Sequence, residues 1–185
     1  MHVLRLLRTF IPLLIVAAIV AGTVLVLTSR AELKRSHRQV ESTWTKLHTQ
    51  LDERYTKLAA ANSAVKQVPG PLHEVVTDVT TAYTIWTDLE VNNGSITAEV
   101  NAANRLESLG RRLVQAARNA PRLKGNASAL AAVEAFAALP APSDARGFDS
   151  SVDHFERERN RPARKLAAQI LGYDSIPTYD ATSPA

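Results

Sequence analysis

The sequence predicts an all-α protein in which an N-terminal transmembrane helix continues into an antiparallel helical bundle of about four helices. Three observations predict it: a long uncharged run near the amino terminus, a seven-residue apolar repeat after it, and helix-length segments separated by Pro, Gly and Asn turns. Few glycines, many alanines and no alternating Val/Ile/Thr stretches favour helix over sheet. The predicted organisation is an N-terminal flank and transmembrane helix at 1–30, a bundle domain at 31–173 and a flexible C-terminal tail at 174–185.

The anchor is the run from Thr9 to Ser29, 21 residues without a charge. As a helix it would be about 30 Å long, which matches the hydrocarbon core of a bilayer. A cleaved secretory signal has a shorter apolar core and small residues at its cleavage site, whereas Leu27 to Arg30 offers bulky and charged ones. A buried helix of a soluble core rarely stays uncharged for this length. The run therefore predicts a single-pass membrane protein, with the lipid bilayer as a partner.

Basic residues on the two sides of the run predict its orientation. Arg5 and Arg8 precede it. The Lys and Arg residues that follow within about 17 positions are Arg30, Lys34, Arg35, Arg38 and Lys46. Because the side rich in Lys and Arg usually stays cytoplasmic, the C-terminal domain is predicted to face the cytoplasm. The same residues would attract anionic headgroups, each by about 1 kcal/mol.

A heptad pattern typical of a coiled coil follows from Leu33 to Val68. Its a and d positions are Leu33, His37, Val40, Trp44, Leu47, Leu51, Arg54, Leu58, Ala61, Val65 and Val68. Only one tolerated glycine lies between Pro12 and Pro69, so the anchor helix is expected to continue unbroken through this seam. Arg54 is the charged exception. The favoured interpretation is that its stem packs on the seam while its guanidinium snorkels to water; the alternative is a buried ion pair, for instance with an acid of the second helix.

Further helical segments follow the break at residues 69–71, where Pro, Gly and Pro end the first helix. Apolar spacing places them at about 72–90, 98–119, 127–139 and 143–169. Ser95 or Thr97 is expected to cap the 98–119 helix, and Pro162 to kink or break the last one. The inward positions are Leu72, Val75, Val76, Val79, Tyr83, Trp86, Leu89 or Glu90, Val100, Ala103, Leu106 or Leu109, Leu113, Ala116 or Ala117, Leu130, Val133, Phe136, Ala137, Phe148, Val152 and Phe155. Residues 174–185 lack periodicity and are expected to trail off as an extended tail.

The net charge of +4 conceals blocks of charge. Between Lys66 and Arg105 every charged residue is acidic, whereas the flanking stretches are basic. If these segments form antiparallel helices, the acidic second helix lies beside basic neighbours and complementary fields help to select the pairing. Individual surface pairs contribute only about 0 to 1 kcal/mol.

Three segments resemble the LemA family of single-span bacterial membrane proteins. The first is VESTWTKLHTQLDER at 40–54, which is similar in Trp44, Gln50, Leu51 and Arg54. The second is NAPRLKGNASAL at 119–130, which is similar to the family's Pro-x-Leu-Lys-x-Asn turn. The third is FDSSVDHFERERNRPARKLAAQILGY at 148–173, which resembles the family's paired aromatic-Asn steps, a Pro and a closing Gly-aromatic step. The chain departs from the family in three places. Lys57 to Asn62 replaces a hydrophobic stretch that follows the Arg in the family, and Asp149 and Glu156 replace the Asn after each aromatic residue. Pro140 and Pro142 interrupt a helix that the family usually keeps continuous. The resemblance implies a helical-bundle domain behind one membrane span and a short outside amino terminus.

Motifs that carry chemistry are weak in this sequence. The five histidines have no spacing typical of a zinc site, and the absence of Cys excludes disulfides and thiolate nucleophiles. Asp149, Asp153 and Glu156 share a helical face, which is read as solvated rather than as an acid/base or cation site. No phosphate loop, GxSxG elbow or dinucleotide fingerprint occurs. Catalytic, cofactor-binding and metal-ligating residues are therefore predicted to be none.

Arginine clusters at 111–118 and 157–164 are read as solvated or lipid-facing surface rather than as a nucleic-acid site, because few aromatics lie among them. Trp44 and Trp86 are read as packing residues. The predicted function is a non-enzymatic interaction or scaffold module near the inner surface of the cell membrane, with an unknown membrane-proximal protein partner and no nucleic acid. The alternative is an outward-facing sensor or adaptor domain of an envelope-stress or signalling assembly. A homo-oligomer is left open.

Overall fold

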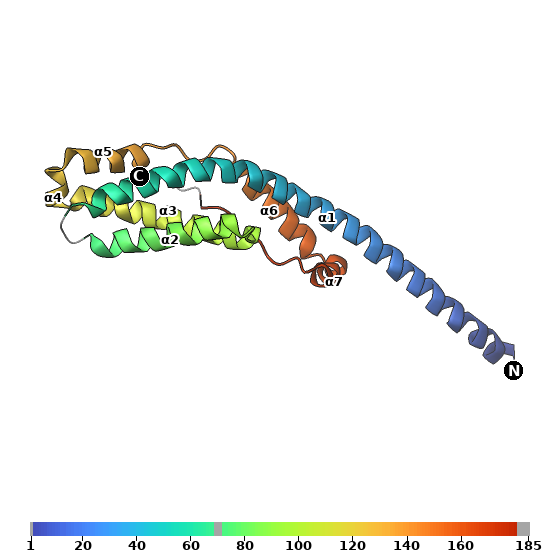
Figure 1. The fold of residues 1–185 in the computed structure, drawn as a ribbon. Helices are drawn as coiled ribbons and strands as arrows, with labels where there is room; N and C mark the ends of the chain where they lie inside the picture. The colour runs from blue at the N-terminus through green and yellow to red at the C-terminus, as the bar shows by residue number, and fades with distance from the viewer. Residues whose placement is uncertain (1, 69–71, 181–185) are drawn as a thin grey trace. The chain divides into compact units, whose positions relative to one another are not determined.

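The computed structural model describes residues 2–68 and 72–180, with side chains for 30–68, 72–162 and 164–180. The described part is all helical and contains no strand, which confirms the predicted fold class at that level (Figure 1). Its helices are α1 (His2–Lys66), α2 (His73–Val91), α3 (Ile96–Asn119), α4 (Pro121–Lys124), α5 (Ala127–Ala137), α6 (Ala145–Arg159) and α7 (Pro162–Leu171). The predicted break at 69–71 lies outside the described residues.

Among the residues whose side chains the structure describes, no helix is both long and apolar enough to cross a bilayer. The run from Thr9 to Ser29, on which the transmembrane prediction depends, lies outside those residues.

The chain divides into two compact units. The first unit comprises Met1–Gln39 and His154–Asp174, and the second unit comprises Val40–Asp153 and Ser175–Ala185. The predicted bundle domain at 31–173 is thus shared between two units, and both α1 and α6 contribute residues to each.

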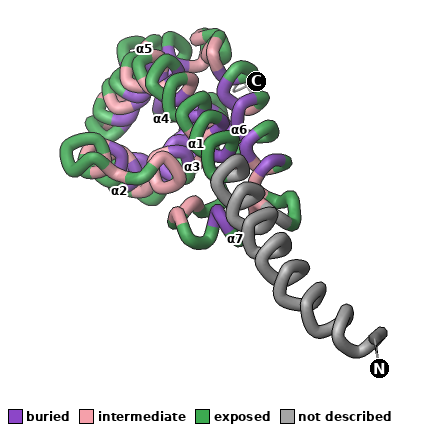
Figure 2. Tube along the Cα trace, turned by 90° about the vertical axis from the view of Figure 1, so that its right-hand side faces the viewer, coloured by how far each residue is buried: buried purple, intermediate pink, exposed green. Residues whose placement is uncertain are grey.

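The second unit is a helical bundle built on the heptad seam of α1. Val40, Trp44, Leu47, Leu51, Leu58, Ala61 and Val65 are all at most 4 % exposed, as the repeat predicts for a and d positions. Figure 2 shows that the buried residues lie on the faces that these helices turn toward one another. Gly110 of α3 permits close packing on α5, because a Cβ there would lie 2.8 Å from the ring of Phe136.

Helix ends in the second unit follow local rules. Ser95 caps α3 by accepting a hydrogen bond from the backbone N–H of Ala98 at 3.3 Å, which confirms one of the two predicted caps. Asn126 caps α5 by accepting from Ala129 N–H at 3.0 Å. The stretch expected to be only a turn between these helices forms the short helix α4, with its Pro at the first position.

The first unit packs α7 and the end of α6 against one stretch of α1. Leu33, Phe155, Ala167 and Ala168 are buried in it. His37 stacks on Tyr173 with ring centroids 4.3 Å apart. Pro162 produces a break rather than a kink, since α6 ends at Arg159 and α7 begins at Pro162.

Residues 174–180 correct the prediction of a tail that trails off. They form no helix, but Ile176 is 5 % exposed and Tyr179 is 3 % exposed, within the second unit. Asn104 and Asp149 hold the backbone there: Asp149 accepts from Tyr179 N–H at 2.8 Å, and Asn104 accepts from Asp180 N–H at 2.7 Å. A two-residue apolar anchor is too short to produce periodicity, which is why the sequence did not reveal it.

Candidate functional site

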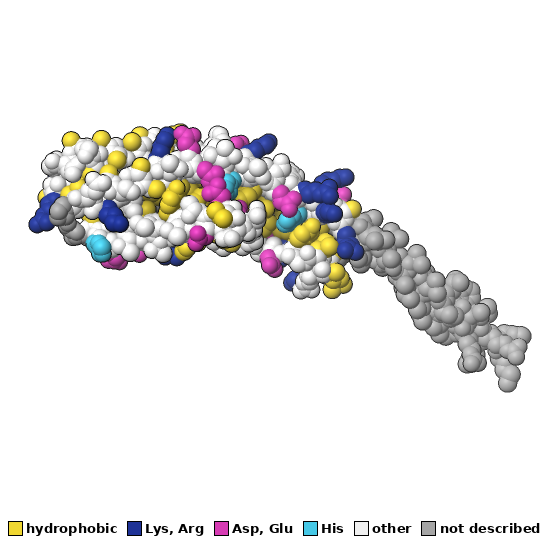
Figure 3. Space-filling view, in the orientation of Figure 1, with side chains coloured by type: hydrophobic (Ala, Val, Ile, Leu, Met, Phe, Trp, Pro, Cys, Tyr) yellow, Lys and Arg dark blue, Asp and Glu magenta, His cyan; other side chains and the backbone are white. Residues whose placement is uncertain are grey.

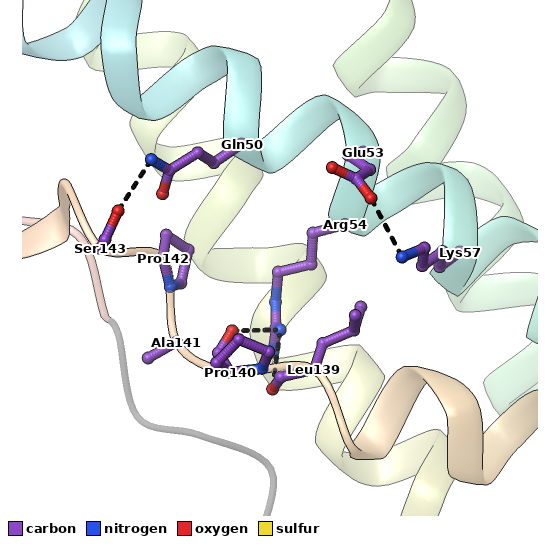
Figure 4. Close-up of a pocket in the computed structure, with 9 residues that line it drawn as sticks. All are labelled: Gln50, Glu53, Arg54, Lys57, Leu139, Pro140, Ala141, Pro142 and Ser143. Atoms are coloured by element: carbon purple, nitrogen blue, oxygen red, sulfur yellow. Dashed lines mark hydrogen bonds and ion pairs between the residues drawn. The ribbon is translucent and has the colours of Figure 1, made fainter.

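The most enclosed polar constellation of the second unit lies beside a hollow between α1 and the loop that joins α5 to α6 (Figure 4). The hollow has a volume of about 390 Å³. It is lined by Gln50, Glu53, Arg54, Lys57, Leu139, Pro140, Ala141, Pro142 and Ser143. The α1 residues fall at helical spacing, so they share one face. The two prolines lack backbone N–H donors and keep the loop from continuing α5.

Arg54 forms the inner wall of this hollow and is buried in a bidentate ion pair with Glu107 of α3. Its Nε lies 2.7 Å from Oε1 of Glu107, and its Nη2 lies 3.1 Å from Oε2. The side chains are 4 % and 2 % exposed. Nη1 donates to the carbonyls of Leu139 and Pro140 at 3.4 and 3.3 Å, as Figure 4 shows. These carbonyls follow the end of α5 and have no helical donor of their own.

This geometry corrects the snorkelling interpretation of Arg54. The side chain is 4 % exposed and forms the buried pair that was the alternative, and the acid comes from the third helical segment rather than the second. The guanidinium also lies 5.1 Å from the ring centre of Phe136. Burial by itself would lower the pKa of Arg54, but the hydrogen bond and charge of Glu107 outweigh it and raise that pKa.

Two tyrosines complete the cluster. The hydroxyl of Tyr179 donates to Oε1 of Glu107 at 2.9 Å, and that of Tyr55 donates to the carbonyl of Ala103 at 3.1 Å. Burial raises the pKa of Tyr179 well above its ordinary range, and the charge of Glu107 and the hydrogen bond to it raise it further. Burial likewise raises the pKa of Tyr55. Both hydroxyls therefore stay protonated near neutral pH and act as hydrogen-bond donors.

The Arg54–Glu107–Tyr179 cluster connects α1, α3, the α5–α6 loop and the segment at 175–180. Arg54 and Glu107 bind each other, and Glu107 also accepts from Tyr179. These hydrogen bonds hold the segments together. Gln50 adds a further link at the mouth of the hollow, because its Nε2 donates to Ser143 Oγ at 3.0 Å and to Asp144 Oδ2 at 2.7 Å.

A second, shallower hollow of about 260 Å³ lies beside Trp44 and His48. The indole N–H of Trp44 donates to Glu99 at 2.5 Å, and His48 stacks on Trp86 with centroids 4.8 Å apart. Trp44 is 4 % and Trp86 is 2 % exposed. The interpretation of both tryptophans as packing residues is confirmed, and each N–H has an acidic partner as a buried indole requires.

The acidic face predicted on the last helical segment is only partly solvated. Asp153 is exposed, but Asp149 is half-buried and accepts the backbone N–H of Tyr179. Burial raises the pKa of Asp149, and the nearby charge of Asp153 also raises it, although the hydrogen bond opposes both effects. Glu156, in the first unit, pairs with Arg159 at 2.9 Å. Among the described side chains, no three His, Asp or Glu residues converge on a point that could hold a metal ion.

The arginine clusters are largely engaged with acids of their own unit. In the second unit, Arg111 lies 3.0 Å from Asp180 and Arg118 lies 3.0 Å from Glu134. Arg112 of α3 lies 3.5 Å from Asp78 of α2, which agrees with the expected pairing of an acidic second helix with a basic neighbour.

Sequence reasoning missed Glu107 and Tyr179. A signal for Glu107 existed: it shares the inward face of α3 with Ala103 and Gly110, so the sequence placed one acid and one arginine, Arg54, at core positions. Two opposite charges at core positions indicate a buried pair.

Comparisons with family models, curated protein sequences and solved structures find no match for this chain.

Proposed function

We propose that this chain is a single-pass membrane-anchored protein of the LemA type whose second unit is a non-catalytic interaction or scaffold module at the cell membrane. The observation that carries the proposal is the uncharged run from Thr9 to Ser29, which precedes the buried seam in the same helix, α1. Such a run is long enough to cross a bilayer as a helix. The helix that would anchor the protein is thus also the helix on which the bundle core is built.

The buried cluster supports a binding role over a catalytic one. General acid/base or nucleophilic catalysis needs a reactive group that can reach the substrate. Glu107 and Tyr179 are 2 % and 3 % exposed and are bonded to each other, and Arg54 is occupied by Glu107. These groups stiffen the wall of the hollow instead of facing into it as reactants. A rigid, preorganised wall suits binding, because less freedom is lost when a partner docks.

Charge supports a domain on the inner side of the membrane. Within the residues that follow the run, Arg30, Lys34, Arg35 and Arg38 lie close to its end, and only Glu32 lies among them as an acid. The rule that governs orientation counts Lys and Arg within about 15–20 residues of a span. Arg5 and Arg8 on the other side are fewer.

Membrane extraction and a terminal reporter test anchoring and orientation separately. The full chain should stay in the membrane fraction after alkaline carbonate treatment, and release into the supernatant would overturn the anchor. A fluorescent reporter fused after Ala185 should be active and alkaline phosphatase fused there should be inactive. The opposite pattern would favour the outward-facing sensor or adaptor and refute the inward orientation.

A photo-crosslinker placed at the mouth of the hollow tests the interaction role. Glu53 is an exposed residue there, and Thr56 is an exposed neighbour on α1 that does not line the hollow. Crosslinking in intact membranes should give one discrete protein adduct from position 53 and much less of it from 56. A second copy of this chain in that adduct would identify a homo-oligomer. No adduct, or equal labelling from both positions, would contradict a specific partner at this surface.

A further inference from the structure

α7 exposes two aliphatic side chains on one face. Leu166 is 57 % exposed and Ile170 is 66 % exposed, and they lie one helical turn apart. Ala167 and Ala168, each 2 % exposed, form the face that packs inside the first unit. Lys165, which is also exposed, lies beside the apolar face. α7 is therefore amphipathic with its small residues inward and its larger apolar residues outward, the reverse of a helix that buries its best apolar face in a core.

Contacts inside the first unit place α7 beside the part of α1 that directly follows the uncharged run. Arg164 near the start of α7 lies 4.0 Å from Glu32 and is also paired with Glu158. Tyr173, just after α7, stacks on His37. At about 1.5 Å per residue, Glu32 and His37 lie roughly 5 and 12 Å along the helix from Ser29. If the run spans the bilayer, Glu32 lies at the depth of the lipid headgroups and His37 lies just beyond them.

The charge of the first unit suits such a location. Residues 30–39 and 154–174 contain nine Lys and Arg against four Asp and Glu. The exposed basic residues are Arg30, Lys34, Arg35, Arg38, Arg157, Arg161 and Lys165. Figure 3 shows Lys and Arg side chains in dark blue and hydrophobic side chains in yellow on the same face of this unit. Basic residues near a membrane surface gain about 1 kcal/mol each from anionic lipids.

We propose that α7 is an interfacial helix that docks on the anionic lipid surface, with Leu166 and Ile170 inserted among the acyl chains and the basic residues of the first unit on the headgroups. The inference rests on the proposed membrane anchor. A protein partner is the weaker occupant, because a stable protein interface buries far more surface than two aliphatic side chains supply. A short helix with an apolar face and flanking Lys or Arg is what a lipid interface binds, with the apolar face about 5–10 Å deep.

Single cysteines report the depth of α7 directly, since the chain contains no Cys of its own. The variants L166C, Q169C and I170C, each carrying an environment-sensitive fluorophore, are compared in the full chain with A60C, an exposed α1 position of the second unit. The protein is reconstituted into vesicles of phosphatidylcholine with phosphatidylglycerol. Quenching by nitroxide-labelled lipid and by aqueous iodide is measured for each label. Both tryptophans lie in the second unit, so their fluorescence confirms that its fold is unchanged.

The ratio of lipid quenching to iodide quenching should be at least about threefold higher at 166 and 170 than at 60, because only Leu166 and Ile170 enter the interface. The ratio at 169 should lie between the value at 60 and the values at 166 and 170. In vesicles of phosphatidylcholine alone the ratio should fall. An unchanged ratio there would overturn the role of the basic residues. Iodide access at 166 and 170 equal to that at 60 would overturn the docking. Protection from both quenchers would show that protein covers α7 and would overturn it as well.

Carbonate extraction of the same labelled preparations separates this inference from the anchor. Chains that resist extraction but have iodide-accessible labels at 166 and 170 would refute the docking of α7 while the anchor stands. Chains released by carbonate would refute the anchor and the docking together.

Discussion

The two units use charge and apolar surface in opposite ways. The second unit contains eleven Lys and Arg against fourteen Asp and Glu, whereas residues 30–39 and 154–174 of the first unit contain nine against four. The second unit buries most of its large aliphatic and aromatic side chains but exposes Ile85 and Val91 of α2, whereas the first unit exposes Leu166 and Ile170 on one face of α7. The chain's modest net charge of +4 is thus the sum of an acidic unit and a basic one. A region that is basic and exposes neighbouring aliphatic side chains on one helix suits a lipid interface.

The largest effect on the stability of the second unit is expected from removing the acid that pairs with its buried arginine. Replacing Glu107 by Leu leaves the Arg54 cation buried without its acid, so the free energy of unfolding should fall by about 3–5 kcal/mol. Denaturant unfolding of the detergent-solubilised chain, followed by tryptophan fluorescence, measures it. The double variant R54M/E107L should regain most of the loss. Glu53→Gln, at an exposed pair, is the matched control and should leave the midpoint unchanged. A double variant no better than E107L would refute the uncompensated charge as the cause.

A pair of leucines sharpens the comparison between the units. Leu51 is fully buried and Leu166 is 57 % exposed. Leu51→Ala should destabilise the second unit by about 2–5 kcal/mol, because it removes buried methyl groups and leaves a cavity. Leu166→Ala should change stability by no more than about 0.5 kcal/mol. Equal effects of the two substitutions would contradict the different roles of these leucines.

Tyr179→Phe tests whether the C-terminal segment belongs to the buried cluster. The variant loses a hydrogen bond to a charged group, which should cost about 1.5–3 kcal/mol. Burial raises the folded-state pKa of Tyr179, so the unfolded chain releases this proton first as the pH rises. The contribution of Tyr179 is therefore complete below about pH 10 and is lost above it. The free energy of unfolding is measured for both proteins at pH 8 and above pH 10. Between these pH values it should fall less in the Phe variant than in the parent chain. Identical pH dependences would refute the assignment.

The smallest expected effect is at Asp149. Asn there keeps an oxygen that can accept the N–H of Tyr179 and removes a half-buried charge near Asp153. The folded-state pKa of Asp149 is raised, so the folded chain takes up the proton before the unfolded chain as the pH falls, and the native protein gains stability on that side. Asp149→Asn should be slightly more stable at pH 7, with the advantage disappearing near pH 4. A destabilised variant at pH 7 would show that the carboxylate charge itself is needed.

Much of the fold could be predicted from the sequence because its determinants are local. The heptad seam, the N-cap at Ser95 and the break at Pro162 depend on residues within a few positions of one another. Nine of the eleven positions of the repeat are buried, and His37 and Val68 are only half-buried. Ser36, Tyr55 and Asn62 of α1 are also buried, although they lie outside the repeat. The membrane anchor remains a prediction of hydropathy, and the LemA resemblance remains a similarity of three segments.

The candidate site was harder to predict because its members come together only through packing. Arg54 was recognised as unusual, but its partner Glu107 is 53 positions away and Tyr179 is 72 positions beyond Glu107. A snorkelling Arg and a buried Arg have the same heptad position, so periodicity cannot separate them. The one available clue was that Glu107, an acid, lies on the inward face of the 98–119 segment and could pair with Arg54.

The sequence alone determined the helices, their breaks and the uncharged run, since apolar period, proline and glycine act over a few residues. Only the tertiary structure decided which charges are buried and which apolar residues stay outside. Burial depends on what a distant segment places against a side chain: α3 brings an acid to Arg54, and α7 packs through its alanines, leaving Leu166 and Ile170 exposed. No local pattern records those encounters, because the two sides of each contact are set in different parts of the chain.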